Sequence, residues 1–357
     1  MLDPSFWNGR NVFLTGHTGF KGSWMILVLA RLGARIHGYA LAPETSPSMF
    51  DVLGLAELCE SHVIADIRDP DALAQAVDRA QPEIAIHMAA QPIVSASYER
   101  PVETFDVNVM GTVHFLEACR RSKPATIVVA SSDKCYRNME DARPFKTDSP
   151  LGGKDPYSAS KAGTELVVES WRYAFIEPEG VSRLASARAG NVIGGGDWSE
   201  NRLLPDAARA FSRKQPLAIR NPEAMRPWQH VLEPVVGYLM LAERLTSDAG
   251  LARAWNFGPN PPVGVPVKVV ADAAVSAWPG SPGWQTPESG QSFGEAKTLL
   301  LDCEETVRDL GWTPRLSVEE AVVMTMDWYQ AFYEGGAEAV RATTEVQISG
   351  YLRSASS

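Results

Sequence analysis

The amino-acid sequence predicts an α/β fold, a doubly wound parallel sheet with a smaller C-terminal subdomain. Three observations support this prediction. Short apolar segments alternate with longer amphipathic segments through the first half of the chain, a glycine-rich turn follows the first apolar segment, and the composition changes after Asn191. Strands that alternate with helices in this way form a parallel sheet that helices cover on both faces.

The predicted elements follow one another at short intervals. Apolar segments predict strands at 12–14, 35–41, 61–65, 83–87, 126–130 and 182–189. Helical spacing of apolar residues predicts helices at 21–32, 70–80, 101–122 and 157–175. These elements belong to a first domain, residues 1–190.

The remainder, residues 191–345, is expected to form mainly the second subdomain, with some segments returning to the sheet. Gly, Pro, Trp and Arg are frequent after Asn191, and we expect the segments 194–198, 221–222 and 226–228 to form loops and short elements that cover the strand ends as a lid. A polar stretch at 279–294 precedes a predicted strand at 298–302, a last helix is predicted to begin at Ser317, and the residues after Gly350 are expected to fray.

The bulk composition indicates a soluble cytoplasmic protein. The net charge of −10 argues against nucleic acid or an anionic membrane surface as a partner. The four cysteines show neither CxxC pairing nor metal-ligand spacing, which favours reduced thiols and no metal site. No apolar signal segment opens the sequence, and its longest apolar run, 24–30, is too short to span a bilayer.

A glycine-rich turn at 16–22 is the strongest indication of a ligand. Its spacing is GxxGxxG, with a predicted strand before it and a helix after it. Glycine permits a tight turn and close approach to a diphosphate, and the helix N-terminus offers free N–H groups. A glycine pattern alone would be weak evidence, but this context predicts a Rossmann-type dinucleotide site. The residues assigned to it are Gly16, Thr18, Gly19, Phe20, Lys21 and Gly22.

Tyr157 and Lys161 stand four residues apart, on one face of a predicted helix. A nearby ammonium group lowers the pKa of a phenol from its usual value of about 10, so the pair is suited to taking a proton from a hydroxyl group. A surface Tyr and Lys on an amphipathic helix is the alternative, since this spacing often occurs by chance.

A second polar cluster, Ser131-Ser132-Asp133-Lys134, directly follows the predicted strand 126–130. It therefore stands at the carboxyl end of a sheet strand, where open α/β sheets bind ligands. An ordinary polar turn between a strand and a loop is the alternative interpretation.

Five motifs together resemble the CDP-glucose 4,6-dehydratases, a branch of the extended short-chain dehydrogenase/reductase family. The resemblance spans about residues 7 to 315. Many members of the wider family carry Thr-Asp-Glu where this chain has Ser132-Asp133-Lys134, and a lysine in the third place resembles the CDP-glucose branch. The motifs are GHTGFKGSW (16–24), SSDKCY (131–136), YSASK (157–161), GNVIGGGDW (190–198) and RPWQHVLEP (226–234).

The resemblance implies a role for each residue of the polar clusters. Tyr157, with Lys161, would deprotonate the C4 hydroxyl of CDP-glucose while hydride passes from C4 to NAD+. Asp133, beside Ser132, would protonate the departing C6 hydroxyl, and hydride would then return to C6. Lys134 replaces the usual glutamate that removes the C5 proton, and it acts either as that base in its neutral form or as an electrostatic stabiliser.

The resemblance also implies the cofactor and substrate contacts. Asp66 and Ile67 would lie near the adenine, Ala89, Ala90, Gln91 and Ser131 would line the cofactor cleft, and Asn108 would support Lys161. The segment 39–43 lacks the acidic residue that usually binds the adenosine ribose, so NADP+ remains an alternative, although no basic pair favours it. Gln91, Asn191, Arg202 and Arg226 would contact the substrate.

The resemblance further implies a homodimer built on the helices 101–122 and 157–175, with Val109, Val113, Leu116 and Leu166 as candidate interface residues. Three other functions stay open at this point. They are a nucleotide-sugar 4-epimerase, which needs Tyr157 and Lys161 alone, a 4,6-dehydratase for another nucleotide sugar, and a non-catalytic NAD-sensing protein.

Overall fold

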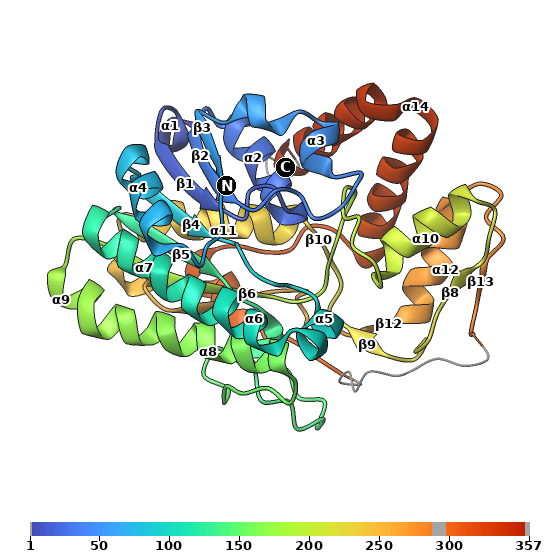
Figure 1. The fold of residues 1–357 in the computed structure, drawn as a ribbon. Coiled ribbons are helices and arrows are strands. Elements are labelled where there is room, and N and C mark those ends of the chain that lie inside the picture. The colour runs from blue at the N-terminus through green and yellow to red at the C-terminus, as the bar shows by residue number, and fades with distance from the viewer. Residues whose placement is uncertain (1, 288–297, 354–357) are drawn as a thin grey trace.

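A seven-stranded parallel sheet forms the centre of the molecule in the computed structural model, which describes residues 2–287 and 298–353 (Figure 1). The strand order is β11-β6-β5-β4-β1-β2-β3, so the chain direction across the sheet reverses between β1 and β4. Open α/β sheets bind ligands at such a point. The strands are β1 (Asn11–Thr15), β2 (Arg35–Ala40), β3 (Ser61–Ile64), β4 (Ile84–His87), β5 (Thr126–Ala130), β6 (Arg183–Ala189) and β11 (Ala254–Phe257).

Helices cover both faces of this sheet, as the sequence predicts. On one face α2 (Phe20–Arg31) packs beside α11 (Leu232–Leu245), and their apolar side chains share a core with β1 and β4. On the other face α4 (Pro70–Ala80), α7 (Gly111–Ser122) and α8 (Pro156–Trp171) enclose a second core. The Rossmann-type α/β fold class is therefore confirmed.

The two long predicted helices each contain a π-helical turn. The first runs as α6 (Pro101–Phe105), η2 (Asp106–Met110) and α7, and the second as α8, η4 (Arg172–Ile176) and α9 (Glu177–Glu179). A π turn inserts one residue and changes which side chains face inward, often near functional sites. In η2 it leaves Asn108 buried against α8.

The segments 194–198, 221–222 and 226–228 form loops and short elements, as the sequence predicts, but longer elements that no pattern predicted lie between and after them. The 14-residue helix α11 is almost wholly buried, and β11 joins the edge of the main sheet beside β6. A helix buried on all sides shows no amphipathic period, which is why the sequence pattern did not reveal α11. The other main helices of this half are α10 (Leu203–Ser212), α12 (Val267–Ala277), α13 (Glu304–Leu310) and α14 (Val318–Arg353), and α14 is kinked at Gly336, where the backbone is not helical.

Two further expectations about the C-terminal region change. At 298–302 only isolated bridges form, at Thr298 and Leu301, instead of a strand. Helix α14 continues past Gly350 to Arg353. Of the polar stretch 279–294, residues 288–294 lie outside the described part of the chain.

No helix in the described ranges is long and apolar enough to cross a membrane. Several short elements connect the longer helices and strands. These elements are α1 (Pro4–Trp7), α3 (Met49–Val52), η1 (Leu55–Leu58), α5 (Val94–Glu99), η3 (Asp133–Cys135), β7 (Val192–Ile193), β8 (Leu217–Ala218), β9 (Met225–Arg226), β10 (Gln229–His230), η5 (Ala249–Leu251), β12 (Val265–Pro266) and β13 (Trp284–Gln285).

Candidate active site

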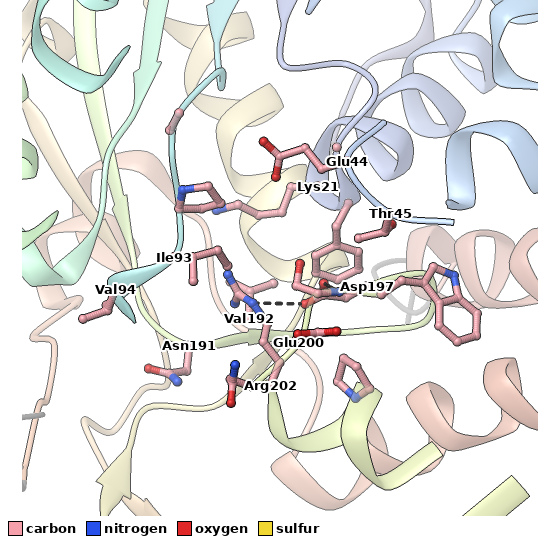
Figure 2. A pocket seen from close by; sticks show the side chains of 18 of the residues that line it. Lys21, Glu44, Thr45, Ile93, Val94, Asn191, Val192, Asp197, Glu200 and Arg202 are labelled. Atoms are coloured by element: carbon pink, nitrogen blue, oxygen red, sulfur yellow. Dashed lines mark hydrogen bonds and ion pairs between the residues drawn. The ribbon is translucent and has the colours of Figure 1, made fainter. Parts of the chain in front are cut away.

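One large cavity opens at the carboxyl ends of β1, β4, β5 and β6, and the second half of the chain closes its other side (Figure 2). Nearly all of the predicted site residues line it, whereas Gln91 and Asn108 stand outside its lining. The predicted residues that line the cavity are Gly16, Thr18, Gly19, Phe20, Lys21, Gly22, Asp66, Ile67, Ala89, Ala90, Ser131, Ser132, Asp133, Lys134, Tyr157, Lys161, Asn191, Arg202 and Arg226.

The glycine-rich turn forms one wall of this cavity and fits a diphosphate. Gly16 has a φ of +74°, and a Cβ there would lie 2.7 Å from the Ala89 nitrogen. A Cβ on Gly22 would collide with the Gly16 carbonyl group, so both positions require glycine. Gly19 caps α2 without a side-chain hydrogen bond, which leaves N–H groups of the first turn for an anion. The residues present therefore fit a dinucleotide.

The residues expected near the adenine lie at the far end of the same wall. The Thr18 hydroxyl donates a hydrogen bond to the Leu41 carbonyl at 2.8 Å, which ties the turn to the segment after β2. The Asp66 carboxylate accepts a 2.6 Å hydrogen bond from Arg68, which lowers the pKa of Asp66. No acidic residue ends β2, but Glu44 lines the cavity slightly further along the chain.

Asn108 and Gln91 support the cavity from behind. The Asn108 amide donates to Ser160 Oγ at 2.9 Å and to the Gln91 carbonyl, and its oxygen accepts from the Gln91 N–H at 2.8 Å. The Gln91 side chain donates to Thr104 at 2.9 Å. Asn108 therefore fixes the loop after β4 against α8, one residue before Lys161.

The acid–base cluster gathers on β5 and α8. Tyr157 and Lys161 are 7% and 5% exposed, and the Asp155 carboxylate caps their helix by accepting from the Ser158 N–H at 2.9 Å. The surface-pair interpretation is therefore wrong.

Asp133 faces the same cavity from the turn after β5. It is 1% exposed, and its Oδ1 accepts from Ser132 Oγ at 3.1 Å and lies 4.0 Å from Lys134 Nζ. Its Oδ2 is buried and has no hydrogen-bond partner among the described residues. A buried oxygen of this kind is expected to have a partner, so a ligand group is a candidate for it.

The pKa of Tyr157 differs from the value that the sequence predicts. Burial raises the pKa of Tyr157 to about 12, although the Ser132 hydroxyl lowers it in part. Burial also lowers the pKa of Lys161 to about 8, a change that the charge of Glu165 opposes. The sequence predicts a lowered pKa for the Tyr157 phenol, but in the protein without ligands this pKa is raised. The effect of burial is larger than the effect of the groups that lower the pKa.

Cationic and amide groups face the acid–base cluster from the second half of the chain. Arg202 Nε lies 3.5 Å from the Asp197 carboxylate, as the dashed line in Figure 2 shows. Arg226 is buried and donates to the Met225 carbonyl at 2.9 Å. Asn191 Oδ1 is buried and has no hydrogen-bond partner among the described residues. These groups suit an anionic ligand with several oxygens.

Sequence reasoning missed a buried ion pair behind Lys161. Glu165, one helical turn further along α8, accepts from Arg188 Nη2 and from Ser186 Oγ, each at 2.8 Å. Arg188 also donates to the Tyr136 hydroxyl at 2.7 Å. The four-residue spacing from Lys161 to Glu165 indicates that both side chains lie on one face of the helix. The sequence does not indicate Arg188 on β6 as the partner of Glu165, because that contact depends on tertiary structure.

Comparison with known proteins agrees with this geometry. The model of the NAD dependent epimerase/dehydratase family matches residues 12–258. The chain is 44% identical to CDP-glucose 4,6-dehydratase of Salmonella typhimurium over 99% of each chain. It is 26% identical to UDP-glucose 4-epimerase of Mycolicibacterium smegmatis over 89% of this chain and 97% of the relative.

A solved structure shares the fold. The UDP-glucose 4-epimerase of Thermus thermophilus, solved in complex with NAD, superposes with a TM-score of 0.77 at 22% identity. The match covers 89% of this chain and 98% of the solved chain.

Proposed function

The chain belongs to the NAD dependent epimerase/dehydratase family, and we propose that it converts CDP-D-glucose to CDP-4-dehydro-6-deoxy-D-glucose. One observation carries the choice of reaction. Asp133 and Lys134 line the same cavity as Tyr157 and Lys161, so groups for oxidation and for elimination stand together. The 44% identity to a CDP-glucose 4,6-dehydratase supports the choice of nucleotide.

NAD, the cofactor, supplies a hydride acceptor for C4 and a hydride donor for C6 when it is bound. The residues that would hold it are the glycine turn, Asp66 and Ile67, and the walls at Ala89, Ala90 and Ser131. Residues 1–190 would thus hold the cofactor, and residues 191–345 would hold mainly the sugar nucleotide.

Each side chain of the cluster would move or hold one proton or charge. Tyr157 takes the proton of the C4 hydroxyl, and the Lys161 ammonium stabilises its phenolate form. The resulting ketone acidifies the C5 proton, so the C5–H and C6–O bonds can break with loss of water. Asp133 protonates the departing C6 hydroxyl, and Lys134 either receives the C5 proton or stabilises the enolate.

The second half of the chain would hold the substrate phosphates. Arg202, Arg226 and Asn191 line the side of the cavity that faces the acid–base cluster. Two guanidinium groups can bind phosphate oxygens with paired hydrogen bonds, and they supply cations in a chain of net charge −10.

A nucleotide-sugar 4-epimerase is the second candidate. An epimerase needs Tyr157 and Lys161, but it does not break the C6–O bond and has no use for a proton donor at C6. The buried and unpartnered Oδ2 of Asp133 supports the dehydratase, because a buried carboxyl group without a protein partner is suited to give a proton to a ligand.

A panel of nucleotide-glucoses with CDP, dTDP, UDP or GDP tests this proposal. The purified protein with NAD+ should form the 4-keto-6-deoxy product from CDP-glucose, detected by a mass decrease of one water. Formation of a C4 epimer without loss of water would contradict the dehydratase assignment. Preferred turnover of another nucleotide-glucose would contradict the assignment of cytosine.

We also propose a cytoplasmic homodimer that pairs the helices at 101–122 and 157–175, which contain α6, η2, α7, α8 and η4, with the same elements of a second copy. All four cysteines are free, in keeping with a reducing compartment. Val102 on α6 is 74% exposed and Leu166 on α8 is 56% exposed, whereas the expected interface residue Leu116 is buried in the core. Exposed apolar side chains that gather on adjacent helices suit an interface between subunits.

Sedimentation at micromolar concentration tests this assembly. The wild type should sediment as a dimer, and Leu166→Glu should shift it towards the monomer, whereas Val263→Glu, an exposed change outside these helices, should not. A monomeric wild type would overturn the proposal.

A further inference from the structure

Lys21 lies in the glycine-rich turn, at an electrostatically unfavourable position, and the proposed mechanism gives its side-chain ammonium group no role. It is the second residue of α2, so its side chain lies at the positive end of the helix dipole. Acidic residues are favoured in that first turn, and a cation there lowers helix stability. The side chain nevertheless lines the cavity, where Figure 2 shows it among the cavity-lining side chains.

The ammonium group of Lys21 has few partners in the protein. Its Nζ donates a long hydrogen bond of 3.5 Å to the Tyr238 hydroxyl and lies 5.5 Å from the centre of that ring. No carboxylate forms an ion pair with Lys21 within residues 2–287 and 298–353. Tyr238 itself is fully buried on α11. Within the described residues, the positive charge is thus held in the cavity without a direct ion pair.

The charges around Lys21 place it at the reacting end of the cavity. Burial, together with repulsion from Lys161 and Arg202, lowers the pKa of Lys21 to about 8, and attraction to Asp133 partly opposes this lowering. The hydroxyl of Tyr238, its hydrogen-bond partner, interacts in turn with Asp133 and Tyr157. At pH 7 the lysine remains mostly protonated, so a cation faces the groups that carry out the C4 oxidation.

We propose that Lys21 makes the protein distinguish the two oxidation states of the nicotinamide ring. The ring carries a positive charge when oxidised and none when reduced. A fixed cation beside it therefore weakens binding of NAD+ relative to NADH and favours oxidation of the sugar. This inference rests on the proposed C4 oxidation at Tyr157, which brings the nicotinamide to this end of the cavity.

Simple electrostatics sets the size of the effect. Two unit charges about 6 Å apart at an effective dielectric constant of about 20 change an equilibrium by about 10- to 100-fold. The same factor would help to keep the cofactor reduced until C6 can accept hydride, which suits a reaction in which hydride leaves and returns at one site.

Binding measurements without sugar test the inference. The dissociation constants of NAD+ and NADH are measured by calorimetry for the full-length wild type and for Lys21→Met, Lys21→Gln and Lys21→Arg. The ratio of the NAD+ constant to the NADH constant should fall about 10- to 100-fold in Lys21→Met and Lys21→Gln. It should stay near the wild-type value in Lys21→Arg, which keeps the charge, and in Lys154→Met, which removes an exposed lysine outside the cavity lining.

Two outcomes would overturn the inference. Equal weakening of NAD+ and NADH in both neutral variants would make Lys21 a ligand of the cofactor phosphates. An unchanged ratio with weaker binding of CDP would make it a ligand of the substrate phosphates. The product assay on the wild type tests the proposed function independently of Lys21. Dehydration of CDP-glucose by the wild type does not depend on the ratio of the NAD+ and NADH dissociation constants.

Discussion

At the scale of single residues, the proposed roles of Asp133 and Lys134 are what would separate a dehydratase from an epimerase. Asp133 is buried with one oxygen bonded to Ser132 and the other unpartnered, and Lys134 reaches the same cavity while remaining 28% exposed. The two neighbours thus present a carboxyl group and an amine to one ligand. Their removal should affect elimination more than the preceding oxidation.

Asp133→Asn and Lys134→Met test this division of labour. Each change should slow dehydration by roughly 10²–10⁴-fold, the usual contribution of general acid–base catalysis. Both variants should still form NADH when mixed with NAD+ and CDP-glucose, and its absorbance should persist because C6 does not become ready for hydride. Asp141→Asn, an exposed change, is the control. If Lys134→Met exchanges the C5 proton with solvent at the wild-type rate, Lys134 is not the base.

In the proposed mechanism, Tyr157 takes the C4 hydroxyl proton in the first oxidation. The protein raises its pKa to about 12, so its activity as a base must rely on the cations present when cofactor and substrate are bound. Tyr157→Phe keeps the buried ring and removes the proton acceptor. We expect loss of turnover and of NADH formation with little change in NAD+ binding, measured by absorbance and calorimetry. Tyr333→Phe, at an exposed position, should behave as wild type, and keto-sugar formation by Tyr157→Phe at the wild-type rate would contradict the assigned role.

At the scale of elements, helix α8 brings the reacting pair and its support to one place. Glu165 follows Lys161 by one turn and pairs with Arg188 on β6, and both side chains are at most 5% exposed. Burial by itself would raise the pKa of Glu165, but the charge and hydrogen bond of Arg188 outweigh it, and the pKa is lowered. The pair therefore fixes α8 against the sheet at the level of the cavity.

Glu165→Gln should lower the free energy of unfolding by about 3–5 kcal/mol, because it leaves Arg188 buried without its counter-charge. Glu117→Gln, which breaks a half-exposed pair with Arg120, should cost less than about 1 kcal/mol. A lowered carboxyl pKa stabilises the fold above the usual glutamate range and loses this effect as the pH falls through the folded-state pKa. The difference between wild type and Glu165→Gln in urea unfolding should thus be full at pH 7 and shrink in acid. Equal costs for Glu165→Gln and Glu117→Gln would contradict the account.

The elements also show which parts of the fold could be predicted from the sequence. Strands β1 to β6 and helix α4 were predictable from short apolar runs or an apolar helical period between turn residues, and β5 and α4 match their predicted bounds. Helix α11 escaped prediction because burial on all sides removes its amphipathic period. Within the site, residue types and spacing indicated Tyr157, Lys161 and Asp133, but the raised pKa of Tyr157 and the open Oδ2 of Asp133 arise from burial that only the fold defines.

At the scale of the whole molecule, the sheet and the second half of the chain gather cations in an acidic protein. Lys21, Lys134 and Lys161 come from the sheet side, and Arg202 and Arg226 come from the opposite side of the cavity. All five side chains line the one cavity that Asp133 and Tyr157 also line. Such an arrangement suits a substrate with a diphosphate and a reaction that builds negative charge on the sugar.

The central claim is that one site oxidises C4, eliminates water and returns the same hydride to C6. Turnover of CDP-glucose carrying deuterium at C4, followed by NMR and mass analysis of the product, tests this claim most directly. The account predicts a 4-keto-6-deoxy product that has lost one water, carries the deuterium at C6 and has taken its C5 hydrogen from solvent. A product of unchanged mass with inverted C4, or a 6-deoxy product without deuterium at C6, would contradict it.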